Sequence, residues 1–193
     1  MNNGKALIFS APSGSGKTTI VKHLIAQFPQ LAFSISATTR QPRAGKEVHG
    51  ADYYFLEQQD FQTRLENDEF IEWEEVYTDN FYGTLKSEIE RIWNQEQVVL
   101  FDVDVKGGLN LKSYFGDQAL AIFVKAPDIE TLRSRLTSRK TENTKDLQVR
   151  LEKIEEELSY ENRFDLVIVN DDLDIALAEA EQVTREFINP PGR

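Results

Sequence analysis

Short apolar runs alternate along the chain with longer stretches of helical character. Four runs have the length and the continuous apolar character of strands buried on both faces, at residues 6–9, 98–101, 120–124 and 166–169. A helical stretch follows each of them, which predicts an α/β fold with a doubly wound, mainly parallel sheet and helices on both faces. Residues 33–36 are a candidate fifth strand.

Two segments depart from this alternation. Residues 38–84 are rich in tyrosine and phenylalanine and predict β and turn structure around one helix near residues 61–65. We therefore expect an inserted β-rich subdomain at residues 36–84, with residues 1–35 and 85–193 forming the core. The second segment, at about 128–157, carries arginines and lysines among helix-forming residues. It predicts a cationic helical region within the core.

Composition narrows the class of protein. A chain of 193 residues with 40% hydrophobic residues is long enough for one compact domain with its own core. The formal net charge of −11 argues against a nucleic-acid groove, because binding a polyanion requires a basic surface. The absence of cysteine excludes thiol nucleophiles and zinc-thiolate sites. With no apolar stretch long enough for a signal peptide or a membrane span, we expect a cytoplasmic protein that binds neither membranes nor nucleic acid.

A glycine-rich turn follows the first apolar run and precedes a helical stretch, the context of a phosphate-binding loop. Gly14 and Gly16 let backbone N–H groups approach an anion, Lys17 supplies a charge, and the Thr18 hydroxyl is a ligand for Mg²⁺. The residues expected to bind a nucleoside triphosphate are Ala11, Pro12, Ser13, Gly14, Ser15, Gly16, Lys17 and Thr18.

Ala11 stands where the first glycine of this motif is expected. If the position required a positive φ, alanine would cost about 1 kcal/mol without removing a phosphate donor. The alternative interpretation of the turn is a glycine-rich connection that binds no ligand.

A second group of residues has the chemistry of a phosphate receptor. Arg40 and Arg43 lie three apart in a turn, and Tyr53 follows among further aromatic residues. Planar guanidinium groups clamp a phosphate monoester, and phenolic hydroxyls add donors. Together with the glycine-rich turn, this pattern predicts two phosphate sites in one small protein.

These motifs and several others occur in an order that resembles the guanylate kinases, which transfer a phosphate from ATP to GMP. The resemblance covers nearly the whole length. It is carried by residues 11–18, 38–43, 50–55, 69–73, 82–84, 102–104 and 168–172. It implies a sheet of P-loop kinase type, with the inserted β-rich segment binding GMP and the segment at about 128–157 forming a helical lid.

The resemblance also implies roles for individual residues. Those that would surround GMP are Ser36, Arg40, Arg43, Tyr53, Glu72, Tyr82, Thr84 and Asp102. Glu72 would accept the guanine N–H groups, the arginines and tyrosines would face the phosphate, and Thr84 would contact the base. Asp102 would contact GMP or a Mg²⁺-bound water. Asn170 would lie near the adenine of ATP. Lys17 and three arginines of the lid, Arg135, Arg139 and Arg150, would neutralise the transferring phosphoryl group.

The chain departs from the family at two places. The turn from Arg43 to Glu47 is one residue longer than usual, which leaves the part played by Glu47 open. Lys106 stands where glutamine is common, and we assign it no role. The lid arginines also admit a second interpretation as ordinary cations on a helix surface.

Two other functions are compatible with parts of the pattern. Guanylate-kinase-like domains of scaffold proteins bind phosphorylated peptides without activity, but they typically lose the phosphate-binding loop that this chain retains. A kinase for AMP or a pyrimidine nucleotide is the nearer alternative. Glu72 and Thr84 argue against it, because adenine cannot reproduce the guanine donors.

Overall fold

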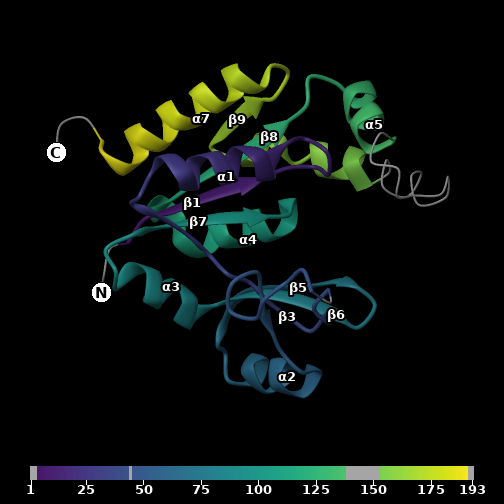
Figure 1. Ribbon diagram of the computed structural model, residues 1–193, viewed down its shortest axis with the longest axis vertical. Helices are drawn as coiled ribbons and strands as arrows, with labels where there is room; N and C mark the ends of the chain where they lie inside the picture. Colours follow the sequence, from purple (N-terminus) through teal and green to yellow (C-terminus); the bar gives the residue numbers. More distant parts are fainter. Residues whose placement is uncertain (1–3, 44, 138–152, 191–193) are drawn as a thin grey trace.

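The computed structural model describes residues 4–43, 45–137 and 153–190. Its main sheet has five strands, all parallel, in the order β2-β7-β1-β8-β9 (Figure 1). The strands are β1 (Ala6–Ser10), β2 (Leu31–Phe33), β7 (Val98–Val103), β8 (Ala119–Lys125) and β9 (Leu166–Val169). The doubly wound parallel sheet expected from the apolar runs is therefore confirmed.

Helices cover both faces of the main sheet (Figure 1). On one face lie α1 (Lys17–Gln27) and α7 (Leu173–Ile188), and on the other lie α3 (Lys86–Trp93) and α4 (Val105–Phe115). Side chains alternate along a strand, so Leu7 and Phe9 pack under the first pair while Ala6 and Ile8 pack under the second. Burial on both faces explains why the strands are continuous apolar runs.

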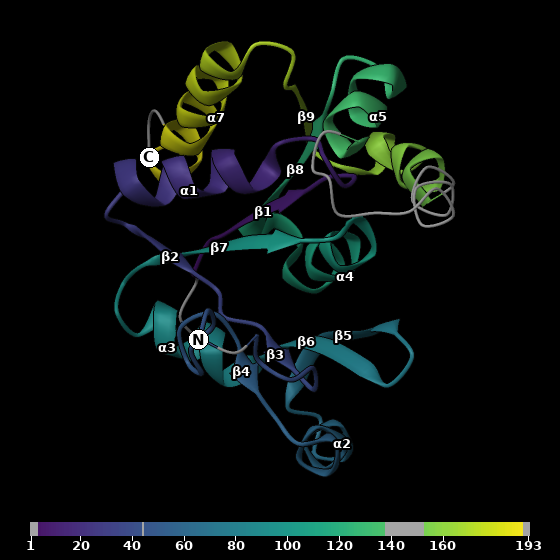
Figure 2. The same ribbon diagram turned by 45° about the vertical axis from the view of Figure 1, so that its right-hand side comes forward.

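A second sheet lies below the main one, with strand order β4-β3-β6-β5 (Figure 2). Its elements are β3 (Ala37–Thr38), β4 (Tyr54–Phe55), β5 (Phe70–Tyr77), β6 (Asn80–Leu85) and the helix α2 (Gln58–Glu66). Phe61 of α2 is buried against Phe70 and Leu85 and closes a small separate core. The helix predicted near residues 61–65 is therefore present, and it is the part of the molecule farthest from the main sheet (Figure 2).

A fifth strand is present as β2, but it covers Leu31–Phe33 and shares only Phe33 with the predicted range of 33–36. The N–H of Ser34 still donates to the carbonyl of Leu100 in β7, at 2.9 Å. The chain then leaves the main sheet and enters the second one at Ala37. One continuous run of residues, 31–38, therefore contributes a strand to each of the two sheets.

The remaining described elements are α5 (Ile129–Thr137), the short 3₁₀ helices η1 (Gly116–Gln118) and η2 (Glu161–Arg163), and a helical stretch at residues 153–158. Within the described ranges, no helix is both long and apolar enough to cross a membrane.

The topology opens a crevice at the carboxyl ends of β1 and β7. These strands are neighbours, but the chain leaves β1 through α1 on one face and leaves β7 through α4 on the other. Ligands of open α/β sheets bind where successive connections diverge in this way. The loop after β1 and the end of β7 therefore define the place to look for a site.

Candidate active site

The glycine-rich loop lines a cavity of about 390 Å³ at this crevice. All eight residues predicted to bind the triphosphate, Ala11 to Thr18, contribute to its wall. Gly14 and Gly16 both have φ of 90°, a conformation that L side chains rarely adopt, and Gly16 is the N-cap of α1. Ala11 has no positive φ, so alanine is accommodated there without backbone strain.

Asp102 at the end of β7 organises the two reactive side chains of the loop. Its carboxylate lies 2.6 Å from Lys17 Nζ and accepts a hydrogen bond from Thr18 Oγ1 at 2.9 Å. Lys17 also donates to the carbonyl of Val103. Lys17 and Asp102 are both largely buried, so each charge compensates the other in the absence of phosphate.

Asn170 lies behind the loop. Its Nδ2 donates to the carbonyl of Ser15 at 2.8 Å, and a Cβ on Gly16 would stand only 2.2 Å from that nitrogen. Glycine at position 16 is therefore also required by packing. Arg135 of α5 donates to the carbonyl of Asn170 at 3.1 Å, which places its guanidinium at the same edge of the sheet. Arg139 and Arg150 lie outside the described residues.

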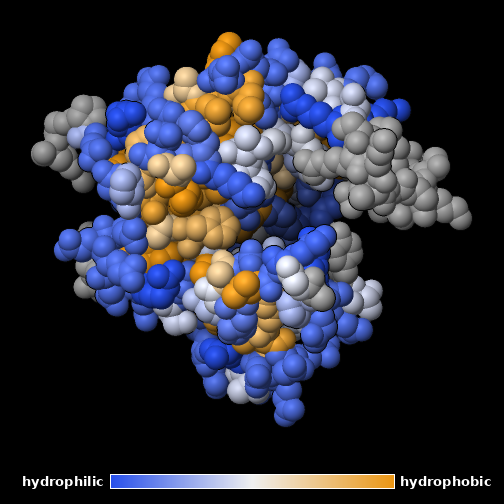
Figure 3. Space-filling view, viewed as in Figure 1, coloured by the Kyte–Doolittle hydropathy of each residue, from blue (hydrophilic) through white to orange (hydrophobic). Residues whose placement is uncertain are grey.

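A second cavity, of about 210 Å³, lies between the second sheet and the end of β7. The surface is hollowed between the upper and lower parts of the molecule, and hydrophilic residues gather there (Figure 3). Five of the residues predicted to bind GMP line this cavity: Ser36, Tyr53, Glu72, Tyr82 and Asp102. Sequence reasoning thus predicted a group that the fold brings together from β5, β6, β7 and two loops.

Glu72 reaches the cavity because β5 contains a bulge. Between the pairs Phe70–Leu85 and Glu72–Thr84, β5 has one extra residue, which re-aims the side chains that follow. Thr84 Oγ1 donates to Glu72 Oε1 at 2.6 Å. Thr84 therefore does not line the cavity itself, but it orients the Glu72 carboxylate that does. Burial raises the pKa of Glu72 to about 7. Gly107, at the start of α4, lies beside Glu72: a Cβ there would be in ordinary contact with Glu72 Oε2 at 3.6 Å and would crowd Asp104 Oδ1 at 3.0 Å.

Two further carboxyl groups line the same cavity, and neither was predicted to bind GMP. Asp104 is the N-cap of α4 and accepts from the N–H of Gly107 at 2.7 Å. Glu74 follows Glu72 by two residues on β5, and burial together with a hydrogen bond to Asp104 raises its pKa to about 7. The cavity is therefore rich in hydrogen-bond acceptors, which suits a ligand that presents several N–H donors.

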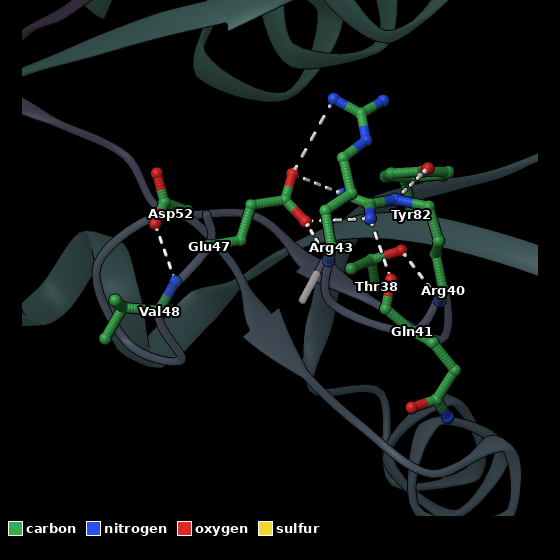
Figure 4. A network of polar contacts seen from close by, with 8 residues as sticks. All are labelled: Thr38, Arg40, Gln41, Arg43, Glu47, Val48, Asp52 and Tyr82. Carbon is green, nitrogen blue, oxygen red and sulfur yellow. Dashed lines mark hydrogen bonds and ion pairs between the residues drawn. The ribbon is translucent and has the colours of Figure 1, made fainter. Parts of the chain in front are cut away.

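Arg40 is held at the edge of this cavity by Glu47 (Figure 4). Its two terminal nitrogens donate to the two oxygens of Glu47 at 2.9 and 3.0 Å, and its Nε donates to the hydroxyl of Tyr82 at 3.2 Å. The guanidinium lies over the ring of Tyr53, 5.3 Å from its centroid. The bidentate pairing raises the pKa of Arg40 and lowers the pKa of Glu47 to about 2.

Arg43 is less constrained. Its backbone N–H donates to Glu47 at 2.8 Å, while its side chain is 74% exposed and its guanidinium lies 4.0 Å from Glu47 Oε1, the oxygen that Arg40 also binds (Figure 4). Neither arginine lines the cavity itself. The long turn thus has a clear structural consequence, because Glu47 holds both arginines from one position.

Three residues that line the cavities were not predicted from the sequence: Asp104, Glu74 and Lys153. A sequence signal was available for the first two and not for the third. Asp104 follows Asp102 by two residues at a strand end, and Glu74 follows Glu72 in the same way, so strand alternation was an available signal. Lys153 lines both cavities, yet nothing in the local pattern of a charged helix distinguishes it.

The donor set fits a nucleoside triphosphate with Mg²⁺. The loop offers a helix N-terminus, a lysine, and a buried Ser15 hydroxyl that has no hydrogen-bond partner among the described residues. Thr18 and Asp102 present adjacent oxygen ligands of the kind that Mg²⁺ prefers. Within the described ranges, no group of three or more histidines, cysteines or carboxylates forms a metal cage.

Comparisons with known proteins give one consistent result. The family model described as Guanylate kinase matches residues 3–186. A Guanylate kinase of Bacteroides thetaiotaomicron is 53% identical over 186 residues, which cover 96% of this chain and 91% of the relative. A Guanylate kinase of Porphyromonas gingivalis is 49% identical over 185 residues, with 95% and 98% covered. The crystal structure of guanylate kinase from Anaplasma phagocytophilum superposes with a TM-score of 0.72 at 28% identity, covering 94% of this chain and 85% of that one. The fold, the site and these similarities agree, and the chain belongs to the guanylate kinase family.

Proposed function

We propose that this chain is an ATP:GMP phosphotransferase that converts ATP and GMP, and also dGMP, to ADP and the corresponding diphosphate. We call the cavity lined by the glycine-rich loop the loop cavity, and the second cavity, which Glu72 lines, the Glu72 cavity. The observation that carries the proposal is that these two cavities share one wall, at the end of β7. Two nucleotides bound in these cavities would meet with their phosphates at that wall. A protein that bound only one nucleotide would not need the second cavity.

The loop cavity is assigned to ATP. Its backbone N–H groups and Lys17 would hold the phosphates, and Thr18, supported by Asp102, would ligate Mg²⁺. When bound, Mg²⁺ supplies charge neutralisation and orients the phosphates. Asn170 is assigned a positioning role on the loop in addition to the adenine contact expected from the family, because it bonds to the Ser15 carbonyl.

The second cavity is assigned to the guanine base. Ionised Glu72 can accept both the N1–H and the exocyclic amine of guanine, and Asp104 lies close enough to the same space to accept as well. In the same pose adenine presents the N1 acceptor and a C2–H group, so it would leave the buried carboxylates without donors at these positions. This contrast supports GMP over AMP as the acceptor.

The GMP phosphate is assigned to the edge of the cavity, where the guanidinium of Arg40 and the hydroxyls of Tyr53 and Tyr82 converge. Arg43 is assigned to the phosphate as well, because most of its side chain is exposed and its ion pair with Glu47 is long, at 4.0 Å. Guanidinium groups bind phosphate through paired hydrogen bonds, which fixes the orientation of the nucleophile.

The chemical step requires positioning and charge stabilisation rather than acid–base chemistry. An oxygen of the GMP phosphate, already anionic at neutral pH, attacks the γ-phosphorus of ATP. The bond from that phosphorus to the β,γ-bridging oxygen breaks, and ADP departs with the electron pair. Lys17 faces the growing charge, and no side chain has to remove a proton. Arg135 and the arginines beyond the described residues, Arg139 and Arg150, are proposed to close over the phosphates.

We further propose that residues 36–84 move as a GMP-binding subdomain relative to the rest of the chain. The second sheet has its own buried core around Phe61, which supports movement as a unit. A cytoplasmic location, where ATP is abundant, and the absence of nucleic-acid and membrane partners stay predictions from composition.

The test is an ADP-release assay with ATP and Mg²⁺ in which GMP, dGMP, AMP, CMP and UMP are supplied in turn. GMP should give the highest kcat/KM, with dGMP close to it and the other three lower by at least about 10²-fold, the discrimination that unpaired buried donors or acceptors produce. Equal activity with AMP would exclude the assignment of Glu72 to guanine. Absence of turnover with every nucleotide would favour the alternative of a peptide-binding module.

A further inference from the structure

The wall shared by the two cavities consists of four residues, Asp102, Val103, Asp104 and Lys153. Three of them are consecutive at the end of β7, whereas Lys153 comes from the helical stretch at residues 153–158. A phosphoryl group that moves from the loop cavity to the acceptor phosphate, at the edge of the Glu72 cavity, has to pass this wall. The chemistry of these four side chains therefore acts directly on the group in transit.

The charges of this wall are unbalanced without Lys153. Asp102 and Asp104 are carboxylates that would repel a transferring phosphoryl group, and among the described residues Lys153 is the only cation that lines both cavities. Lys17, which lines the loop cavity alone, is already paired with Asp102 at 2.6 Å.

Lys153 is held loosely enough to reach a phosphate. Its Nζ lies 3.8 Å from Glu157 Oε1, beyond hydrogen-bond distance, and its side chain is 52% exposed. Its attraction opposes the burial that raises the pKa of Glu74 and of Glu157 to about 7. The ammonium group is therefore near acidic side chains of both cavities, but it is not held by a short hydrogen bond to Glu157.

Building on the proposed function, we propose that Lys153 is a further catalytic residue, whose ammonium group contacts the phosphoryl group as it passes between ATP and the acceptor. In the transition state, negative charge is spread over the equatorial oxygens of that group. A cation at the shared wall stabilises this charge and offsets the carboxylates of Asp102 and Asp104. The flexible four-carbon stem lets the charge follow the group across the wall.

The test compares Lys153→Met and Lys153→Gln, which remove the charge, with Lys153→Arg, which retains it. Lys106→Met is the matched control. Lys106 is also half exposed, at 53%, and is also paired with a glutamate of the same helical stretch, Glu156, at 3.1 Å, but it lines neither cavity. The assay uses whichever nucleoside monophosphate the wild-type protein phosphorylates fastest, so an error in the choice of GMP does not remove the test.

We expect either neutral Lys153 variant to lower kcat by about 10- to 10²-fold with each KM changed less than about 3-fold, in the range for a preorganised charge. The arginine variant should retain most of the activity, and the Lys106 variant should stay within 2-fold of wild type. Thermal unfolding identifies the folded variants, and one folded neutral variant is sufficient for the comparison.

A second readout is independent of turnover. A bisubstrate analogue, in which a polyphosphate bridge joins adenosine to the nucleoside of the acceptor, should bind the neutral variants at least 10-fold more weakly than wild type by calorimetry. Single nucleotides should bind with unchanged affinity. Turnover of the neutral variants equal to that of Lys106→Met, or unchanged affinity for the bridged analogue, would overturn the proposal. Wild-type protein that phosphorylates no monophosphate would instead refute the proposed function.

Discussion

Replacing Glu72 with glutamine changes one atom of a buried carboxylate and leaves its shape intact. In the wild-type structure, Oε1 accepts from Thr84 Oγ1 at 2.6 Å, so Oε2 faces the cavity together with Asp104 and Gly107. A glutamine oxygen can keep the Thr84 bond, which turns the new amide N–H₂ group toward the ligand. The N–H donors of guanine would then face the N–H₂ group of the glutamine, and no hydrogen bond could form between them.

The expected loss follows from the hydrogen bonds involved. A hydrogen bond to a charged group contributes about 1.5–3 kcal/mol, and leaving a buried donor unpaired costs about 1–3 kcal/mol. A net loss of about 3 kcal/mol in transition-state binding corresponds to a fall in kcat/KM of about 10²-fold, because 1.36 kcal/mol is a factor of ten. Activity with AMP, already low, should change far less.

The same substitution should stabilise the free protein at alkaline pH. Burial raises the pKa of Glu72 from 4.5 to about 7, so the folded state binds more protons than the unfolded state between these values. Stability is therefore lost as the pH rises through this window, and the loss is complete above about pH 7, where it reaches about 3 kcal/mol. Glu72→Gln has no such penalty, and its free energy of unfolding should exceed that of wild type at pH 8 but not at pH 4.5.

The assay measures ADP release with GMP and with AMP, alongside urea unfolding at both pH values. The matched control is Glu75→Gln on the same strand, where the side chain is exposed and a glutamine can still accept from the N–H of Asp79. The ratio of wild-type to variant kcat/KM for GMP should rise with pH through about 7, as Glu72 ionises. Equal losses with both nucleotides, accompanied by lower stability at pH 8, would show that Glu72 supports the fold instead of reading the base.

Three further outcomes are expected. Lys17→Ala should lower kcat by at least about 10²-fold while the circular dichroism spectrum stays unchanged. The control Lys22→Ala, on the exposed face of α1, should have no effect on kcat. Near-normal turnover of Lys17→Ala would contradict the assignment of the glycine-rich loop to the ATP phosphates. Glu47→Ala should raise the KM for GMP by about 10-fold and leave the KM for ATP unchanged, because Arg40 loses its two hydrogen bonds to Glu47. An unchanged KM for GMP would mean that the turn is irrelevant to binding. Distance labels on cysteines introduced at residues 59 and 179, in a chain with no other cysteine, should approach each other when GMP binds between the second sheet and the end of β7. Constant distances at saturation would refute closure.

The sequence was sufficient for the main sheet and the loop because both depend on local patterns. Residues 6–9 are apolar on both faces of a strand, and Gly14 and Gly16 take the positive φ that the motif requires. The end of β2 was misplaced because Ser34 continues the hydrogen bonding of one sheet while Ala37 begins another. No local pattern separates two sheets that share an uninterrupted run of residues.

The base cavity was predicted in part, and the omissions have a common cause. Glu72 was found through the family resemblance, whereas Asp104 and Glu74 depend on how β5 approaches the start of α4. Such an approach between distant elements is set by tertiary packing, which sequence spacing does not reveal. Lys153 was missed for the same reason, because its position on the shared wall follows from tertiary structure alone.

The most direct test of the account follows the transferred phosphorus atom. ATP labelled with ³²P at the γ-position is incubated with the protein, Mg²⁺ and an equimolar mixture of GMP, AMP, CMP and UMP, and the products are separated by chromatography. We predict that the label appears in GDP, in amounts equal to the ADP formed, with little label in the other diphosphates. Label released as inorganic phosphate, or distributed among the diphosphates without preference for GDP, would contradict the claim that the loop cavity and the Glu72 cavity bring ATP and GMP together for direct transfer.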